Sequence, residues 1–322
     1  MNLSSSKLIP KWFSFLTTII KFFISTLLVI SYSQAEKLTT TDKTAVNTFN
    51  RSKPNASLII GGHKAKDGEF PYIVSFREAK YPDYHMGAGS LIKPNWVLTA
   101  RHVIFNDEHT ETVECVVSPK YSNKLSEMRG KKKYKVEKMF CYHDKTIFTG
   151  DVAVLKLSEN IPLGNDSPYG IQTVPLLESR NDVDWTKEIY VAGWGQNRHT
   201  WNPSHPQDYP DHLLVVETPL NSNKECESYL EDFQAPVAFC SGREGKTCGS
   251  GDSGGPAIIR GGGKNDVLVG LVSFGRKNTL GPTAFMNVSH FYSWIKDRMR
   301  DEDPKTECKN VYGKNSMKRE NE

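Results

Sequence analysis

The stretch KTCGSGDSGGPAII, residues 246–259, gathers four glycines, an aspartate and a proline around the hydroxyl of Ser253. A glycine-rich turn allows backbone N–H groups to converge on one point and leaves a hydroxyl accessible in a cleft. Taken alone, such a string is more often an ordinary surface turn. Features elsewhere in the chain therefore have to decide between a turn and a functional loop.

Short apolar runs rich in Val, Ile, Tyr and Phe recur along the chain, with Gly, Pro, Asn and Asp clusters between them. They lie at residues 72–76, 90–100, 151–157, 188–194, 213–220, 256–259, 266–274 and 283–288. Many short strands joined by turns predict an all-β fold, and about 240 residues of this texture favour two units with a cleft between them. Only the end looks helical, because residues 290–300 place four apolar side chains on one face: Phe291, Trp294, Ile295 and Met299.

The amino terminus predicts export. Two lysines precede an apolar run at residues 12–32, and SQA at 33–35 offers the small residues that a signal peptidase reads, so we expect a signal peptide over residues 1–35. A signal anchor is the alternative, because about 20 apolar residues can span a bilayer. Lys21 interrupts the run and favours the cleaved signal. We therefore expect a secreted, extracellular protein that has no membrane attachment after signal removal.

The flanking segments and the overall charge narrow the function classes. Residues 36–58 are polar and predict a pro-segment, and residues 301–322 predict a charged C-terminal tail. A formal net charge of +4 on 322 residues is too small to indicate a nucleic acid partner. Three N-x-S sequons, at Asn55, Asn165 and Asn287, are typical of a secreted glycoprotein.

Six cysteines in an exported chain predict disulfide bonds, for which fifteen pairings are formally possible. They are Cys115, Cys141, Cys226, Cys240, Cys248 and Cys308. Three histidines recur in one loop, His199, His205 and His212, but no carboxylate or thiolate stands at ligand spacing from them. We therefore expect no metal site.

A serine hydroxyl is a weak nucleophile until a base takes its proton, and the base needs a carboxylate that orients it. His102 follows a predicted strand in VLTARHVIF, and Asp151 opens DVAVLKL. Each is weak evidence singly, because a lone histidine is often a core residue and an aspartate often begins a strand.

The evidence becomes strong when four sequence strings are considered together, because they occur in the order that one protein family shows. They are IIGG (59–62), GSLIKPNWVLTARH (89–102), DVAVLKL (151–157) and GDSGGP (251–256), and they resemble the trypsin/chymotrypsin-like serine peptidases. VAGWG, AFCSG, LVSFG and a terminal WI extend the resemblance from Ile59 to about Arg300. It implies two packed six-stranded antiparallel β-barrels with a C-terminal helix, forming one peptidase domain over residues 59–300 that is split near residue 170.

The resemblance implies a role for each of these residues. Ser253 is expected to be the nucleophile, His102 the general base and later the general acid, and Asp151 the carboxylate that fixes the imidazole tautomer. The N–H groups of Gly251 and Ser253 are expected to form the oxyanion hole. The resemblance implies a hydrolase that needs no cofactor, with peptide or protein substrates and with an activating protease and protein inhibitors as further partners.

The family also implies how a zymogen is activated and how substrate binds. After cleavage, the new amine at Ile59 is expected to pair with Asp252, although Leu58 stands where the family usually has Arg or Lys. An extended substrate is expected to pair with Ser273, Phe274 and Gly275. Aligned with the family without a gap, Thr247 is expected to form the floor of the primary pocket, and with a one-residue insertion that aligns Cys248 with a family cysteine, Lys246 is. Thr283 is expected to narrow the pocket. Neither floor residue is an acid, so we expect poor cleavage after Arg or Lys.

The cysteines depart from the family pattern. Cys226 with Cys240 matches a family pair, Cys115 with Cys141 is plausible, and Cys248 with Cys308 is what remains. The two positions of the disulfide beside the catalytic histidine are occupied by Gly87 and Val103, so both of its cysteines are absent.

Two functions follow from these observations. The first is a secreted serine endopeptidase that works through an acyl-enzyme. The alternative is a catalytically silent, protease-like binding or regulatory protein, which the atypical junction at Leu58 and the missing cysteines favour.

Overall fold

The computed structural model describes residues 61–106, 111–112, 115–142, 144, 146–195, 210–261, 266–275, 281–300 and 308. All of them belong to one compact unit, Asn55–Glu322. The predicted signal peptide, pro-segment and activation junction lie outside the described residues, as does the predicted tail except for Cys308. None of the helices in these ranges combines the length and the apolar character that a bilayer-spanning helix needs.

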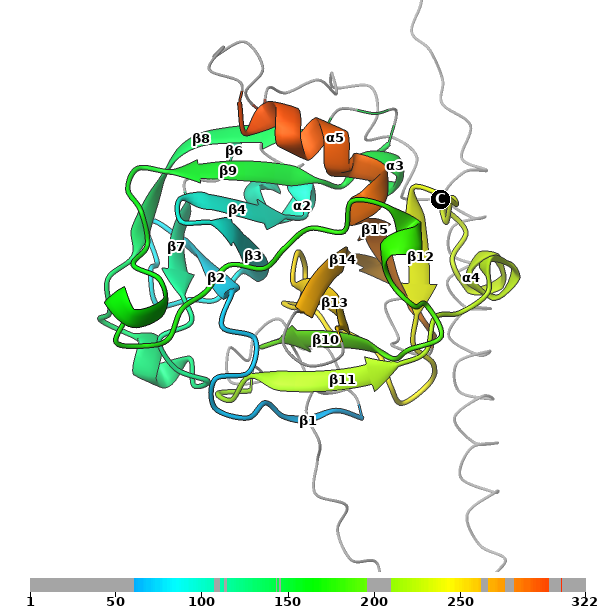
Figure 1. Cartoon of the computed structure of the whole chain (residues 1–322), viewed down its shortest axis with the longest axis horizontal. Coiled ribbons are helices and arrows are strands. Elements are labelled where there is room, and N and C mark those ends of the chain that lie inside the picture. Colours follow the sequence, from blue (N-terminus) through cyan, green and yellow to red (C-terminus); the bar gives the residue numbers. More distant parts are fainter. Residues whose placement is uncertain are drawn as a thin grey trace, which may run out of the picture. The chain divides into compact units, whose positions relative to one another are not determined.

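Six antiparallel strands from the first half of the domain close into a barrel (Figure 1). Closure leaves no unpaired strand edge, and the side chains that point inward form a core of Val, Ile, Leu and Phe. In barrel order the strands are β2 (Ile73–Glu78), β3 (Gly87–Lys93), β4 (Trp96–Thr99), β9 (Ala153–Leu157), β8 (Tyr134–Cys141) and β7 (Cys115–Pro119).

The second unit is a seven-stranded antiparallel sheet, which appears in green, yellow and orange in Figure 1 apart from its blue edge strand β1. Six strands come from the second half of the domain, and the two-residue strand β1 adds to β11 at one edge. The predicted all-β fold of two packed units is therefore confirmed, with β1 as a seventh strand in the second unit. The order is β1 (His63–Lys64), β11 (Leu214–Thr218), β10 (Ile189–Gly193), β13 (Pro256–Arg260), β14 (Asp266–Gly275), β15 (Thr283–Asn287) and β12 (Ala238–Ser241).

The predicted C-terminal helix is present as α5 (Val288–Arg298). Asn287 caps it by accepting a hydrogen bond from the N–H of Ser289, and Phe291 and Ile295 are buried as the pattern predicted. The expectation of helix only at the chain end was wrong, because α4 (Asn223–Tyr229) is a further helix. A capping box between Ser222 and Glu225 starts it.

The remaining described elements are short. They are the helical turns α2 (Arg101–Ile104) and α3 (Ile147–Gly150), the two-stranded sheet of β5 (Phe105–Asn106) and β6 (Glu111–Thr112), and the 3₁₀ turns η1 (Ser126–Met128), η2 (Gly164–Asp166) and η3 (Arg180–Asp182).

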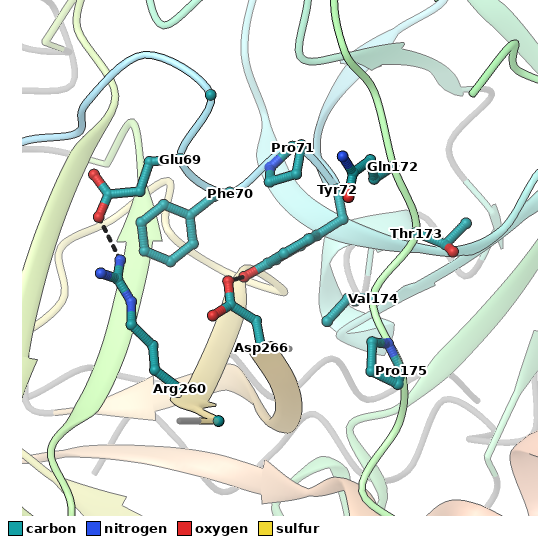
Figure 2. A pocket seen from close by; sticks show the side chains of 12 residues that line it. Glu69, Phe70, Pro71, Tyr72, Gln172, Thr173, Val174, Pro175, Arg260 and Asp266 are labelled. Atoms are coloured by element: carbon teal, nitrogen blue, oxygen red, sulfur yellow. Dashed lines mark hydrogen bonds and ion pairs between the residues drawn. The ribbon is translucent and has the colours of Figure 1, made fainter. Parts of the chain in front are cut away.

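Polar pairs join the two units where they meet, around a cavity of about 490 Å³ (Figure 2). The hydroxyl of Tyr72, on the first unit, donates to the carboxylate of Asp266, on the second, over 2.7 Å. Glu69 and Arg260 form an ion pair across the same seam. Burial raises the pKa of Tyr72 well above its usual value, and the neighbouring Asp266 carboxylate raises it further, so the phenol stays a donor.

Two disulfides occur among the described residues, Cys226–Cys240 and Cys141–Cys308. The first is the pair that the resemblance implied. The second shows that the other two expected pairings, Cys115 with Cys141 and Cys248 with Cys308, are wrong.

Strand register explains the change of partner for Cys141. β7 pairs with β8 only at Tyr134 and Lys135, and continuing this register puts Cys115 opposite Val136. Cys141 lies five residues farther along β8, about 17 Å away. A disulfide needs Cα atoms closer than about 7 Å. The chain at Cys308 instead lies on β8, where its N–H donates to the carbonyl of Met139 over 2.8 Å.

Candidate active site

Strand pairing in the first barrel brings His102 and Asp151 together. β4 and β9 are antiparallel, with Thr99 opposite Ala153. His102 lies three residues beyond Thr99, in α2, and Asp151 lies two residues before Ala153, so both side chains project from the same end of the strand pair. Nδ1 of His102 lies 2.7 Å from Oδ2 of Asp151, and the backbone N–H of His102 donates to Oδ1 over 2.9 Å.

Asp151 is held in its ionised form although it is 2% exposed. Burial by itself would raise the pKa of this carboxyl. The charge and hydrogen bonds of His102 and the hydroxyl of Ser273, which donates to Oδ2 over 2.5 Å, outweigh burial and lower the pKa below its usual value. Ser273 belongs to β14 of the second unit, so the carboxylate is shared between both halves of the domain. The sequence predicted only substrate pairing for Ser273, and this contact was missed.

Glycines bring the turn of Ser253 against the first barrel. The carbonyl of Ser253 accepts a hydrogen bond from the N–H of Ala88 over 2.8 Å. A Cβ on Gly87 would lie 2.9 Å from the side chain of Val103 and 3.1 Å from the carbonyl of Ser253, so Gly87 fits between α2 and the nucleophile turn. Gly254 has φ +72°, and a Cβ there would lie 2.1 Å from the hydroxyl of Thr99. The structure therefore places Ser253 beside the helical turn that carries His102.

The same turn presents two backbone donors. Gly251 has φ +97°, a conformation that favours glycine. Among the described residues, neither the N–H of Gly251 nor that of Ser253 donates to a backbone carbonyl. Both donors are thus available for an anionic oxygen, as an oxyanion hole requires.

His85 contacts the carbonyl group of Gly251. Its Nε2 lies 2.9 Å from the Gly251 carbonyl oxygen, and its Nδ1 lies 2.8 Å from the hydroxyl of Ser75. Burial lowers the pKa of His85 to about 4, so the ring is neutral at pH 7 and Nε2–H donates to the carbonyl while Nδ1 accepts from Ser75. Sequence reasoning missed His85, although it stands two residues before Gly87 and close to the turn.

Asp252, the residue before Ser253, is fully buried. Its carboxylate accepts hydrogen bonds from the N–H groups of Gly195, over 2.7 Å, and Gly249, over 2.8 Å. A Cβ on Gly193 would come within 2.0 Å of this carboxylate, so only glycine lets the chain wrap around it. Burial raises the pKa of Asp252 to about 6 despite these hydrogen bonds. Its expected partner, Ile59, lies outside the described residues.

The two alternatives for the pocket floor are distinguished by the hairpin turn of residues 243–246. Arg243 and Lys246 exchange backbone hydrogen bonds of 2.9 Å, which leaves Lys246 half-buried at the turn. Thr247 is turned inward and buried, and its hydroxyl lies 2.9 Å from the hydroxyl of Thr283. Of the two alternatives, Thr247 is therefore the buried one, and its side chain is neutral and small.

Residues 273–275 have one open edge. β13 pairs with β14 only as far as Leu271, whereas β15 pairs with Phe274 and Gly275 on the other side. Phe274 also makes an edge-to-face contact with Phe148, with ring centroids 5.0 Å apart. Among the described strands, this edge is free to accept an extended peptide.

A serine in a glycine-rich turn, beside a histidine bonded to a buried aspartate, between two antiparallel β units, is the arrangement of a serine peptidase. The sequence model of the Trypsin family matches residues 59–295. The chain belongs to the trypsin family and is a serine endopeptidase.

Similar proteins point to the same family. Granzyme-like protein 1 of Rattus norvegicus is 31% identical over 263 residues, which cover 76% of this chain and 92% of the relative. Granzyme B of Rattus norvegicus is 30% identical, covering 77% of this chain and 94% of the relative. Granzyme B(G,H) of Mus musculus is 28% identical, with coverage of 77% and 94%.

Proposed function

We propose that this chain is a secreted zymogen whose mature form cleaves proteins after small or medium-sized apolar residues through an acyl-enzyme on Ser253. The observation that carries the proposal is the buried Asp151 carboxylate, bonded to His102 beside the turn of Ser253. The predicted signal peptide supports secretion, and so does the exposed sequon at Asn165, whereas Asn287 is buried as the cap of α5.

The chemistry follows from the roles of these groups. Oγ of Ser253 attacks the substrate carbonyl while Nε2 of His102 takes the hydroxyl proton, and the N–H groups of Gly251 and Ser253 stabilise the oxyanion. The carbon–nitrogen bond then breaks, and the imidazolium gives its proton to the leaving amine. Water, deprotonated by the same imidazole, attacks the acyl-enzyme, and the returned proton regenerates Ser253. Asp151 stays ionised and stabilises the imidazolium in both halves.

The chemistry of the pocket supports an apolar preference. Thr247 and Thr283 are neutral and their hydroxyls are bonded to each other, so neither residue offers a carboxylate to a cationic side chain. Burying an unpaired cation is costly, so Arg and Lys should bind poorly. Thr283 occupies space at the pocket wall and restricts large side chains.

Activation by cleavage at Leu58–Ile59 is part of the proposal. The carboxylate of Asp252 is buried with only N–H partners among the described residues, which makes a cationic amine from Ile59 a favourable addition. Because Leu58 precedes this bond, the activating protease has to cleave after an apolar residue. The atypical junction also favours the second candidate, a binding protein that is never cut.

A fluorophosphonate probe tests the proposed function. The full chain would be expressed with its signal, cleaved, and its terminus at Ile59 checked by amino-terminal sequencing. Stoichiometric labelling that disappears in Ser253→Ala and persists in Ser250→Ala, a serine of the same turn, is expected. Absence of labelling after verified cleavage would support the binding protein instead.

A further inference from the structure

We infer that Trp194 is a positioning residue for the oxyanion hole, and that it connects the hole to a surface loop of the first barrel, residues 122–127, in which Ser126 and Glu127 are exposed. This inference rests on the proposed function, because the oxyanion hole matters only in an active peptidase. Trp194 is fully buried and follows directly after β10.

Trp194 supports the oxyanion turn from two sides. Its ring makes an edge-to-face contact with the ring of His85, with centroids 5.7 Å apart, and His85 in turn lies 2.9 Å from the carbonyl of Gly251. The next residue, Gly195, donates its N–H to the carboxylate of Asp252 over 2.7 Å. The position of the indole therefore determines where the His85 ring and the Gly195 N–H lie, and these two groups hold Gly251 and Asp252.

The indole is itself anchored by the first barrel. Its Nε1–H donates to the backbone carbonyl of Asn123 over 3.0 Å, and the N–H of Leu213 donates to the same oxygen over 2.6 Å. The side chain of Asn123 donates to the carbonyls of Ala65 and Lys66 over 3.2 Å and accepts from Lys120 over 3.1 Å. These contacts fix the position of Asn123, and its carbonyl in turn fixes the indole of Trp194.

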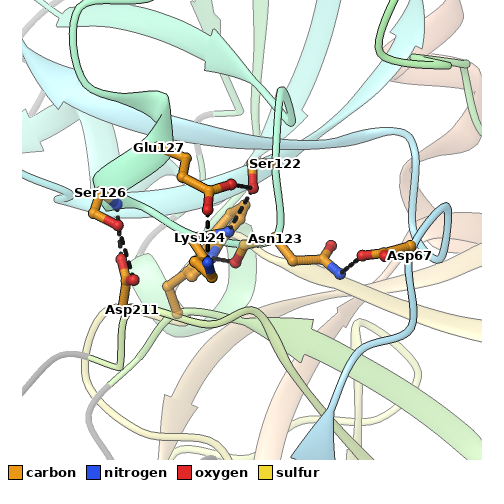
Figure 3. A network of polar contacts seen from close by, with 8 residues as sticks. Asp67, Ser122, Asn123, Lys124, Ser126, Glu127 and Asp211 are labelled. Carbon is orange, nitrogen blue, oxygen red and sulfur yellow. Dashed lines mark hydrogen bonds and ion pairs between the residues drawn. The ribbon is translucent and has the colours of Figure 1, made fainter.

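The anchoring loop is held by a polar cluster at the surface, defined as Asp67, Ser122, Asn123, Lys124, Ser126, Glu127 and Asp211 (Figure 3). The N–H and the hydroxyl of Ser126 donate to the two carboxylate oxygens of Asp211 over 2.7 and 2.8 Å. Asp211 precedes β11, so this contact fastens the loop to the second unit. Glu127 accepts from Ser122 over 2.5 Å and from Lys124 over 2.6 Å, which closes the loop on itself.

Loss of the indole N–H should displace the oxyanion donors without leaving a large cavity in the core. Trp194→Phe keeps an aromatic ring beside His85 but cannot donate to Asn123. We expect kcat to fall about 10-fold with little change in KM, because small displacements of oxyanion donors act on the transition state rather than on substrate binding. Asp211→Asn, at the surface, should produce the same pattern with a smaller fall.

The matched control is Trp185→Phe. The indole N–H of Trp185 also donates to a backbone carbonyl, that of Arg180, over 2.8 Å, and its ring also makes an edge-to-face contact, with Phe239. It has no contact in common with the oxyanion turn among the interactions described. Its kcat should therefore remain at the wild-type value even if its thermal stability falls.

Two inhibitors distinguish positioning from general damage. Activity would be normalised to the sites that a fluorophosphonate titrates in the cleaved full-length protein. For Trp194→Phe the Ki of a peptide boronate, which places an anionic tetrahedral centre in the hole, should rise by the same factor by which kcat falls. The Ki of the matching peptide amide, which has no such centre, should not change.

Three results would overturn the inference: a kcat for Trp194→Phe that equals that of Trp185→Phe, equal changes in both Ki values, or no effect of Asp211→Asn on kcat and boronate binding. If Trp194→Phe does not fold, Asp211→Asn alone decides. Failure of the wild-type protein to react with the fluorophosphonate would instead reject the proposed function, and the inference with it.

Discussion

His85 and Asp252 hold the oxyanion turn from two directions, and the same cause, burial, shifts their pKa values oppositely. Nε2 of His85 lies 2.9 Å from the carbonyl of Gly251, and the carboxylate of the next residue, Asp252, accepts from the N–H groups of Gly195 and Gly249. The pKa of His85 falls to about 4 and that of Asp252 rises to about 6. The turn is thus flanked by one histidine that resists protonation and one carboxyl that resists ionisation.

These shifts predict opposing pH dependences in the uncut chain, where no Ile59 amine exists. For Asp252, stability is full below the unfolded pKa near 4 and is lost as the pH rises through about 6. For His85, stability is full above the unfolded pKa of about 6.5 and is lost as the pH falls toward 4. Each contributes about 3 kcal/mol, so the two nearly cancel in the wild-type protein.

Single variants of an inactive Ser253→Ala precursor separate the two contributions. Relative to that parent, Asp252→Asn should gain stability as the pH rises from 4 to 6.5, and His85→Gln should lose stability over the same interval. Urea unfolding at several pH values measures both slopes, and all other titrating groups are common to the three proteins. Parallel curves for the two variants would contradict the prediction.

The hydroxyl of Ser273 should matter to catalysis through Asp151. A hydrogen bond to a charged group contributes about 1.5 kcal/mol or more, so we expect Ser273→Ala to slow fluorophosphonate labelling of Ser253 by about 10-fold. Ser241→Ala is the control, because Ser241 is likewise buried and hydrogen-bonded, to Thr218, in the same sheet. Equal labelling rates in the two variants would show that the contact with Asp151 has no catalytic importance.

The size of the primary pocket should depend on Thr283. We expect Thr283→Gly to increase cleavage after Phe and Tyr relative to cleavage after Ala and Val, because the wall at this position would be removed. Thr283→Ser keeps the hydroxyl that faces Thr247 and should retain most of the original preference. A peptide library profiled with the mature enzymes measures this, and dominant cleavage after Arg or Lys by the wild-type enzyme would refute the proposed pocket chemistry.

Activation should depend on a cut after Leu58. Amino-terminal sequencing of the native secreted protein is expected to begin at Ile59, and Asp252→Asn is expected to abolish activity after the same cut. Removing one partner of a buried ion pair costs about 3 to 5 kcal/mol, which is enough to disorder the oxyanion turn. An uncut chain beginning near Glu36 that still hydrolyses peptides would rule this mechanism out.

The sequence was sufficient for features that depend on local pattern. Short apolar runs bounded by turn residues predicted strands such as β9 and β14 close to their observed bounds, and the spacing of Phe291 and Ile295 predicted α5. The candidate catalytic residues were identified because each stands in a distinctive short string. Such strings reflect a local backbone geometry that few other sequences can adopt.

Features that depend on long-range contacts could not be predicted in this way. His85 and Asn123 stand in no distinctive string, and Trp194 stands in VAGWG, which indicated the family but not what the indole contacts. The importance of these residues comes from partners up to 166 residues away. The pairing of Cys141 with Cys308 depends on strand register in the first barrel and on the path of the chain after α5. A sequence pattern contains neither, so the remaining cysteines were paired by elimination, and wrongly.

The bond between Cys141 and Cys308 closes a covalent ring that contains most of the catalytic domain, with a sequence separation of 167 residues. The connection between the two β units and the turn of Ser253 both lie within it. A single proteolytic cut anywhere in this ring therefore releases no fragment, and a peptidase that nicks its own copies during storage would remain one molecule. Such nicks would separate fragments on a denaturing gel only after the disulfide is reduced.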